Sequence, residues 1–175
     1  MAAGQPTILA TSGGYKPGER TRIEFNHLMH YAVELSGVTG RAPKVTHIGT
    51  ASGDQRWWAA EMDQAARIAG FDFSHLNLFT MPNIEDPEAH LLEQDVVWVN
   101  GGSVVNLLAV WRAHGLDRIL RKAWEGGVGL VYRGTELVEV VSEIKNKAAF
   151  RVTPGAGESV DAVAVEERLE SRFLG

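Results

Sequence analysis

The sequence predicts an α/β fold, a three-layer sandwich in which helices cover both faces of a mostly parallel sheet. Over the first two-thirds of the chain, short apolar stretches alternate with longer amphipathic ones, the pattern of βαβ units. Three of the apolar stretches end in loops rich in glycine and serine, "SGGY", "GTASGD" and "NGGS". Because functional loops of parallel sheets gather beyond the carboxyl ends of the strands, we expect these three loops to form the functional edge.

The individual elements follow from hydrophobic periodicity and from residues that begin or end helices. Strands are expected where short apolar or alternating runs occur, at 7–11, 45–48, 71–79 and 96–99. Helices are expected where apolar residues recur at intervals of three and four, at 17–36, 55–70, 86–94, 103–113 and 117–124. Asp54 is expected to cap the second helix, and Gly37 and Gly70 to end the first and second.

The last third of the chain has a different pattern. Three short apolar runs, at 128–132, 136–142 and 148–154, predict a β-meander. The tail from 159 to 175 fits either a strand or a frayed helix.

Length and composition predict one domain over residues 1–175 and exclude several kinds of protein. The apolar fraction of 45% and charged fraction of 22% are typical of a soluble globular protein. The net charge of −5 argues against nucleic-acid binding, and the lack of cysteine excludes disulfides and a cysteine nucleophile. No apolar run reaches the roughly 18 residues of a membrane span, and the first residues lack a basic leader, so a cytoplasmic location is expected.

Gly101 and Gly102 form the strongest candidate site. They lie between a predicted strand and the start of a predicted helix, where free backbone N–H groups favour an anion or an oxyanion. The alternative is a tight turn that needs glycine for its backbone angles alone. The spacing is neither that of a Rossmann turn nor that of a P-loop, and no cofactor is expected.

Serine and histidine residues give weaker signals. Ser12, Ser52 and Ser103 lie in the glycine-rich loops, with Gly13 beside the first, but none occurs in a Gly-x-Ser-x-Gly elbow. None of the six histidines follows a metal-binding pattern, and His47, inside an apolar strand, is expected to be a hydrogen-bonded core residue. No metal site is expected.

The segments "ILATSGGY", "HIGTASGD", "VVWVNGGSVVNLLAVWRAHGLDRILRKAWEGGV" and "GLVYRGTELVEVVS" together resemble the peptidase E family (dipeptidase E, aspartyl dipeptidase; serine peptidase family S51). Val96–Trp124 looks like that family's Gly-Gly-Gly-Asn-Thr-x-x-Leu-Leu block, with Asn100 at the first glycine and Ser103 at the asparagine. The resemblance implies a class I glutamine amidotransferase-like fold, an oxyanion turn at Gly101 and Gly102, and a short acidic peptide as substrate.

The same resemblance points to a missing segment. In this family a strand, a nucleophile elbow and a histidine loop follow the helices, whereas here "EGGV" joins "GLVYRGT" directly. We therefore expect an internal deletion with its junction near 127–130, no catalytic serine, and an inactive hydrolase. The alternative is a non-catalytic module that binds a small carboxylate or other anion, or that associates as a homodimer through a resealed sheet edge.

Overall fold

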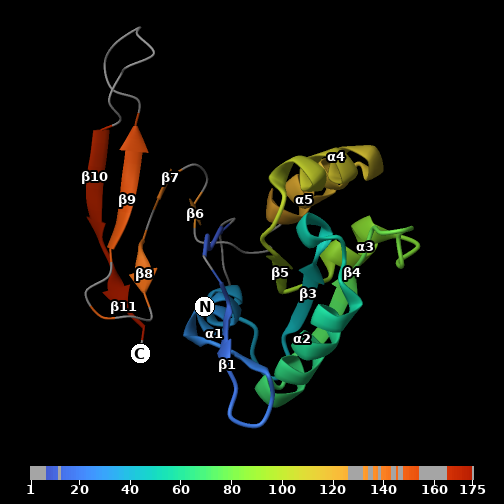
Figure 1. Cartoon of the computed structure of the whole chain (residues 1–175), viewed down its shortest axis with the longest axis horizontal. Coiled ribbons are helices and arrows are strands. Elements are labelled where there is room, and N and C mark those ends of the chain that lie inside the picture. The colour runs from blue at the N-terminus through green and yellow to red at the C-terminus, as the bar shows by residue number, and fades with distance from the viewer. Residues whose placement is uncertain are drawn as a thin grey trace, which may run out of the picture.

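A computed structural model describes the chain at residues 7–11, 13–125, 132–133, 136–137, 139–142, 145, 148–153 and 165–174. Its centre is a parallel sheet of three strands in the order β4-β3-β5. The strands are β3 (Lys44–Ile48), β4 (Asp72–Leu76) and β5 (Val96–Val99), and Val45 of β3 pairs with Phe73 on one side and Val96 on the other. The predicted parallel α/β sheet is confirmed for these three strands (Figure 1).

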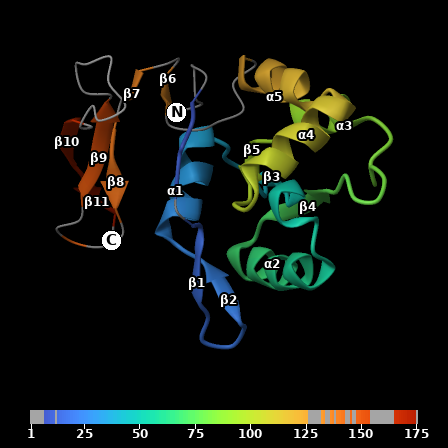
Figure 2. The ribbon, with the colours of Figure 1, turned by 45° about the horizontal axis from the view of Figure 1, so that its top comes forward.

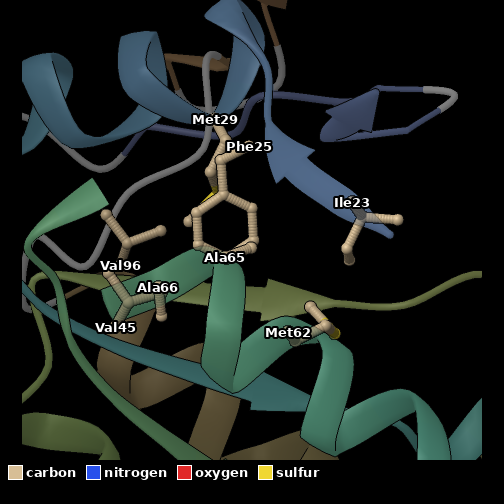
Figure 3. Packing of buried hydrophobic residues seen from close by; sticks show 8 residues of the cluster. All are labelled: Ile23, Phe25, Met29, Val45, Met62, Ala65, Ala66 and Val96. Atoms are coloured by element: carbon tan, nitrogen blue, oxygen red, sulfur yellow. The ribbon is translucent and has the colours of Figure 1, made fainter. Parts of the chain in front are cut away.

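Helices pack on both faces of this sheet because its side chains alternate between two apolar clusters. On one face lie β2 (Ile23–Phe25), α1 (His27–Ser36) and α2 (Arg56–Ala69). Figure 3 shows the side chains of this first cluster, which are Ile23, Phe25, Met29, Val45, Met62, Ala65, Ala66 and Val96.

The opposite face is covered by α3 (Pro87–Leu92), α4 (Val104–His114) and α5 (Leu116–Glu125). Its buried cluster consists of Ile48, Leu76, Leu78, Leu91, Val97 and Leu116. Val96 and Val97 therefore pack on opposite faces, as neighbours on a strand must. None of the helices in the described ranges is long and apolar enough to span a membrane.

The predicted ends of most helices are confirmed. The residues at these ends have conformations that are typical of helix caps. Gly37 and Gly70 end α1 and α2 with φ of 71° and 74°, a left-handed conformation that glycine adopts at low cost. Pro87 occupies the first turn of α3, where its missing N–H leaves no hydrogen bond unmade.

The N-terminal elements differ from the prediction. Residues 7–11 form no strand, and Ile23 and Phe25 belong to β2, which pairs with β1 (Tyr15–Pro17) in an antiparallel hairpin. The helix begins only at His27, where the Asn26 side chain accepts the N–H of Met29. Ile23 and Phe25 are two residues apart, a spacing that places both on one face of a strand but not of a helix.

The predicted role of Asp54 is also wrong. The N-cap of α2 is Gln55, and no side chain caps this helix. The Asp54 carboxylate instead accepts the N–H groups of Leu78 and Phe79, with Oδ2 at 2.7 and 2.9 Å. The Asp54 carboxylate, at a residue with φ 49°, therefore bonds to the backbone after β4 instead of capping α2.

The described residues in the last third of the chain form strands, and the pairing of these strands is not that of a meander. β6 (Tyr132–Arg133) pairs with β7 (Glu136–Leu137), β8 (Val141–Ser142) with β11 (Arg172–Phe173), and β9 (Ala148–Thr153) with β10 (Val165–Glu170). The two C-terminal strands, β10 and β11, therefore pair with β9 and β8. Residues 128–131 and the expected deletion junction lie outside the described residues. Figures 1 and 2 show β8 to β11 beyond α1, on its far side from the central sheet.

Candidate functional site

Two loops meet at the carboxyl edge of the sheet. The short helical turn η1 (Thr50–Ser52) follows β3, and residues 100–103 connect β5 to α4. The N–H of Asn100 donates to Ile48 O at 3.0 Å, and the N–H of Ser103 donates to Ala51 O at 2.9 Å. The structure thus brings the predicted residues Ser52, Gly101, Gly102 and Ser103 to one place.

The two glycines of this turn have different surroundings. Gly102 has φ 148°, and a Cβ there would lie 2.4 Å from Ala51 O, so only glycine fits. A Cβ on Gly101 would meet nothing within 4 Å. Within the described ranges, the N–H groups of Gly101 and Gly102 have no hydrogen-bond partner. Exposed N–H groups beside the positive end of an 11-residue helix are the chemistry that binds anions.

The serine hydroxyls near this turn have structural partners. Ser103 Oγ accepts the N–H of Asn106 at 3.3 Å and caps α4, and Ser52 Oγ donates to Gly49 O at 3.0 Å. Ser12 lies outside the described residues. Gly13 lines a small apolar recess with Leu28 and Trp98, to which the Gly101–Gly102 turn contributes no residue.

One serine does contact an imidazole, in the cluster Thr46, Ser74 and His90. His90 Nε2 lies 3.0 Å from Thr46 Oγ1 and 3.3 Å from Ser74 Oγ. Ser74 is in the middle of β4 rather than at a turn, and it donates to Thr46. Among the described residues no carboxylate hydrogen-bonds to His90, so this cluster lacks the orienting acid of a triad. It satisfies the hydroxyl of the fully buried Thr46.

Sequence reasoning missed a second cluster of polar side chains, whose hydrogen bonds connect α2 to the sheet. Asp63 Oδ1 lies 3.1 Å from His75 Nε2, and His75 Nδ1 lies 3.1 Å from His47 Nδ1. His47 is 4% exposed, as expected of a core residue, and its burial and the neighbouring His75 lower its pKa to about 3. The parallel pairing of β3 with β4 brings the two histidines together, and nothing in either strand sequence alone indicates that pairing.

No three histidine, cysteine, aspartate or glutamate side chains of the described residues gather as metal ligands would. The structure therefore defines an α/β protein with a glycine turn at the carboxyl edge of its parallel sheet. Residues 8–135 match peptidase family S51, and the chain belongs to this family.

A curated relative is similar to part of the chain. Over 86 residues the chain is 40% identical to "Uncharacterized peptidase YgaJ" of Bacillus subtilis (strain 168). The matching region is 49% of this chain and 37% of the relative, so the chain spans well under half of that protein. No solved structure matches the chain.

Proposed function

We propose that this chain is a peptidase S51 scaffold that binds the carboxylate of short acidic peptides without hydrolysing them. In this proposal residues 1–175 form one domain of the class I glutamine amidotransferase-like type, from which the segment carrying the nucleophile is missing near 127–130. Membership of the family supports the choice of a peptide ligand.

The observation that carries the proposal is the contrast between the glycine turn and the serines around it. Gly101 and Gly102 offer unpartnered N–H groups, whereas Ser52 and Ser103 use their hydroxyls to fix a turn and a helix end. A serine nucleophile needs a base within hydrogen-bond reach, and neither hydroxyl contacts an imidazole. Binding without a triad leaves only a small remnant of catalysis.

The expected affinity is low, because the turn is exposed. Each favourable contact of an anion with a helix N-terminus contributes about 0.3–1 kcal/mol at a solvated site. A few such contacts with backbone N–H groups total about 1–3 kcal/mol, which corresponds to a dissociation constant of roughly 10 mM or weaker.

Titration of the ¹⁵N-labelled protein with an Asp-containing dipeptide tests this function. The amide signals of Gly101, Gly102 and Val104 should shift progressively up to dipeptide concentrations on the order of 100 mM, and the dipeptide should remain intact. The Gly101→Asp variant, which adds a negative charge at the turn, should lose these shifts. The control Ile68→Asp adds the same charge on α2, at a side chain that is 58% exposed, and should retain them. Unchanged turn signals, or release of free aspartate by the parent chain, would reject the proposal.

A second candidate function, self-association, is favoured by the surface of α4. Val104 and Val105 are 66% and 78% exposed, and Leu108 lies one turn further along the same helix. No residue of α4 is fully buried, which is unusual for so apolar a helix. Contiguous exposed apolar side chains are typical of an interaction surface.

A further inference from the structure

Asn100 directly follows β5 and begins the glycine turn, and its side chain has no role in the proposed function. It precedes Gly101, and this is the only Asn-Gly pair in the sequence, since each of the other five asparagines precedes a residue with a side chain. An asparagine before glycine can lose its side-chain amide spontaneously, because glycine places no Cβ in the path of the ring closure that expels it. The sequence therefore makes Asn100 a candidate modification site.

The structure leaves the Asn100 side chain free to take part in this reaction. Within the described ranges it makes no hydrogen bond and no ion pair. Asn83 is a contrasting case, because its side chain accepts the N–H of Asn77 at 2.8 Å and donates to His75 O at 2.9 Å. The Asn83 amide must give up both hydrogen bonds before it can rearrange, whereas the Asn100 amide gives up none.

The attacking atom in such a reaction is the backbone nitrogen of Gly101, which is accessible. Gly101 is exposed, its N–H has no partner in the described part of the chain, and a Cβ there would meet nothing within 4 Å. Hydrogen bonds anchor the turn on either side of it. The N–H of Asn100 donates to Ile48 O, and the N–H of Ser103 donates to Ala51 O. Because Gly101 lies in open space between these anchors, its backbone can rotate toward the Asn100 side chain without a clash.

We propose that Asn100 is a site of spontaneous deamidation. The Gly101 nitrogen forms a bond to Asn100 Cγ and loses its proton, the Cγ–Nδ2 bond breaks, and Nδ2 leaves as ammonia. The product is a five-membered succinimide ring. Solvent water then adds to one of the two ring carbonyls and opens the ring, which gives aspartate or isoaspartate. The net reaction consumes one water and releases one ammonia without any change in oxidation state.

Deamidation changes the charge and the backbone of the turn. Either product places a carboxylate directly before Gly101 and Gly102, where it repels a second anion. Isoaspartate also adds a methylene group to the backbone between the two anchoring hydrogen bonds. Weaker anion binding by the modified chain is a consequence that rests on the proposed function, whereas the deamidation itself does not.

Incubation of the full chain at mildly alkaline pH, followed by proteolysis and mass spectrometry, tests the site without any ligand. The peptide that contains Asn100 should gain the mass difference between an amide and an acid, several times faster than the peptide that contains Asn83. An isoaspartate methyltransferase, which labels only the isoaspartate product, should label the Asn100 peptide. Equal rates at the two asparagines, or conversion of Asn83 while Asn100 stays intact, would overturn the inference.

The Gly101→Ala variant tests the proposed route. Its methyl group meets no atom within 4 Å in the folded chain but hinders ring closure, so conversion at Asn100 should slow several-fold. The control Gly13→Ala adds a methyl group that also meets nothing within 4 Å, in a different loop, and should convert at the rate of the parent. Equal rates at Asn100 in the two variants would contradict the attack by Gly101.

The converted chain separates this inference from the proposed function. The amide shifts that an Asp-containing dipeptide induces at Gly102 and Val104 should be weaker after conversion than before it. Conversion at Asn100 with unchanged shifts would confirm the modification site and reject the role of the turn in anion binding.

Discussion

At the scale of single residues, the glycine turn combines one position fixed by packing with one left open. Gly102 touches the backbone of Ala51, and Gly101 faces free space. The close contact of Gly102 with Ala51 explains the shape of the turn. The free space beside Gly101 leaves room for a ligand to approach the backbone. The structural interpretation of the Gly-Gly pair therefore applies to Gly102, and the functional interpretation is our proposal for Gly101.

A comparison of alanine variants tests this division. Gly102→Ala would force a Cβ to within 2.4 Å of Ala51 O at a φ of 148°, so the free energy of unfolding should fall by about 1–3 kcal/mol. Gly101→Ala should change it by less than about 1 kcal/mol, because nothing lies within 4 Å of the added atom. Urea denaturation followed by tryptophan fluorescence measures both, and equal losses would contradict the described packing.

The lowered pKa of His47 predicts that the free energy of unfolding depends on pH. Its pKa is about 3 in the folded chain and 6.5 ordinarily, so the unfolded chain binds more protons between these values. The stabilising effect of the neutral imidazole is complete above about pH 6.5 and falls as the pH drops toward 3, by up to about 1.4 kcal/mol per pH unit.

Unfolding curves measured at several pH values for the parent and for His47→Gln isolate this effect. Burial also lowers the pKa of His30 and His90, which adds a slope of the same sign to both proteins. The variant should therefore show the shallower pH dependence. Parallel curves would mean that His47 does not titrate as described.

At the scale of elements, the chain shows where periodicity predicts structure and where it does not. α2 and α5 are predicted because their apolar residues recur at helical spacing over ten residues or more, and β5 because its apolar run ends at Asn100. The hairpin of β1 and β2 is missed because three-residue strands contain too few residues to show a period of two. Pairings between distant strands, such as β8 with β11, depend on tertiary contacts that no local pattern encodes.

An interaction between Tyr31, Glu139 and Arg172 joins the C-terminal strands to α1. Tyr31 Oη donates to Glu139 Oε2 at 2.8 Å, and Arg172 Nε donates to Glu139 Oε1 at 2.5 Å. The Arg172 guanidinium also lies 5.3 Å from the centre of the Tyr31 ring. The hydrogen bond from Arg172 lowers the pKa of Glu139, which remains a carboxylate near neutral pH.

Loss of this interaction should release the C-terminal strands without unfolding the sheet. In Arg172→Gln, amide hydrogen exchange should become faster in β8 and β11 and remain unchanged in β3. Arg168→Gln removes the exposed Arg168–Glu170 ion pair within β10 and serves as the control. Equal exchange in β8 and β11 of both variants would show that Arg172 does not anchor them.

The exposed face of α4 makes a separate prediction about self-association. If Val104, Val105 and Leu108 form a homodimer contact, Val105→Lys should lower the mass measured by light scattering at high protein concentration. The control Ile68→Lys changes a side chain on α2 that is also more than half exposed and should leave the mass unchanged. A monomeric parent, or equal masses for both variants, would exclude this use of α4.

At the scale of the whole molecule, a three-stranded parallel sheet with both faces covered carries the glycine turn at its carboxyl edge. The sequence predicts this architecture and the position of the turn, because the Gly- and Ser-rich loops directly follow β3 and β5. It does not predict the Asp63–His75–His47 chain, since that contact depends on strand register. The fold is consistent with membership of peptidase family S51. The hydroxyls of Ser52 and Ser103 make structural hydrogen bonds, so we propose no serine chemistry at this turn.

The most direct test of this account is intact-mass spectrometry after incubation with a fluorophosphonate, which reacts covalently with activated serines. We predict that the mass of the chain stays unchanged and that an Asp-containing dipeptide incubated in parallel is not cleaved. Stoichiometric addition of one phosphonate group to a serine of this chain, together with dipeptide cleavage that the reagent abolishes, would contradict the central claim.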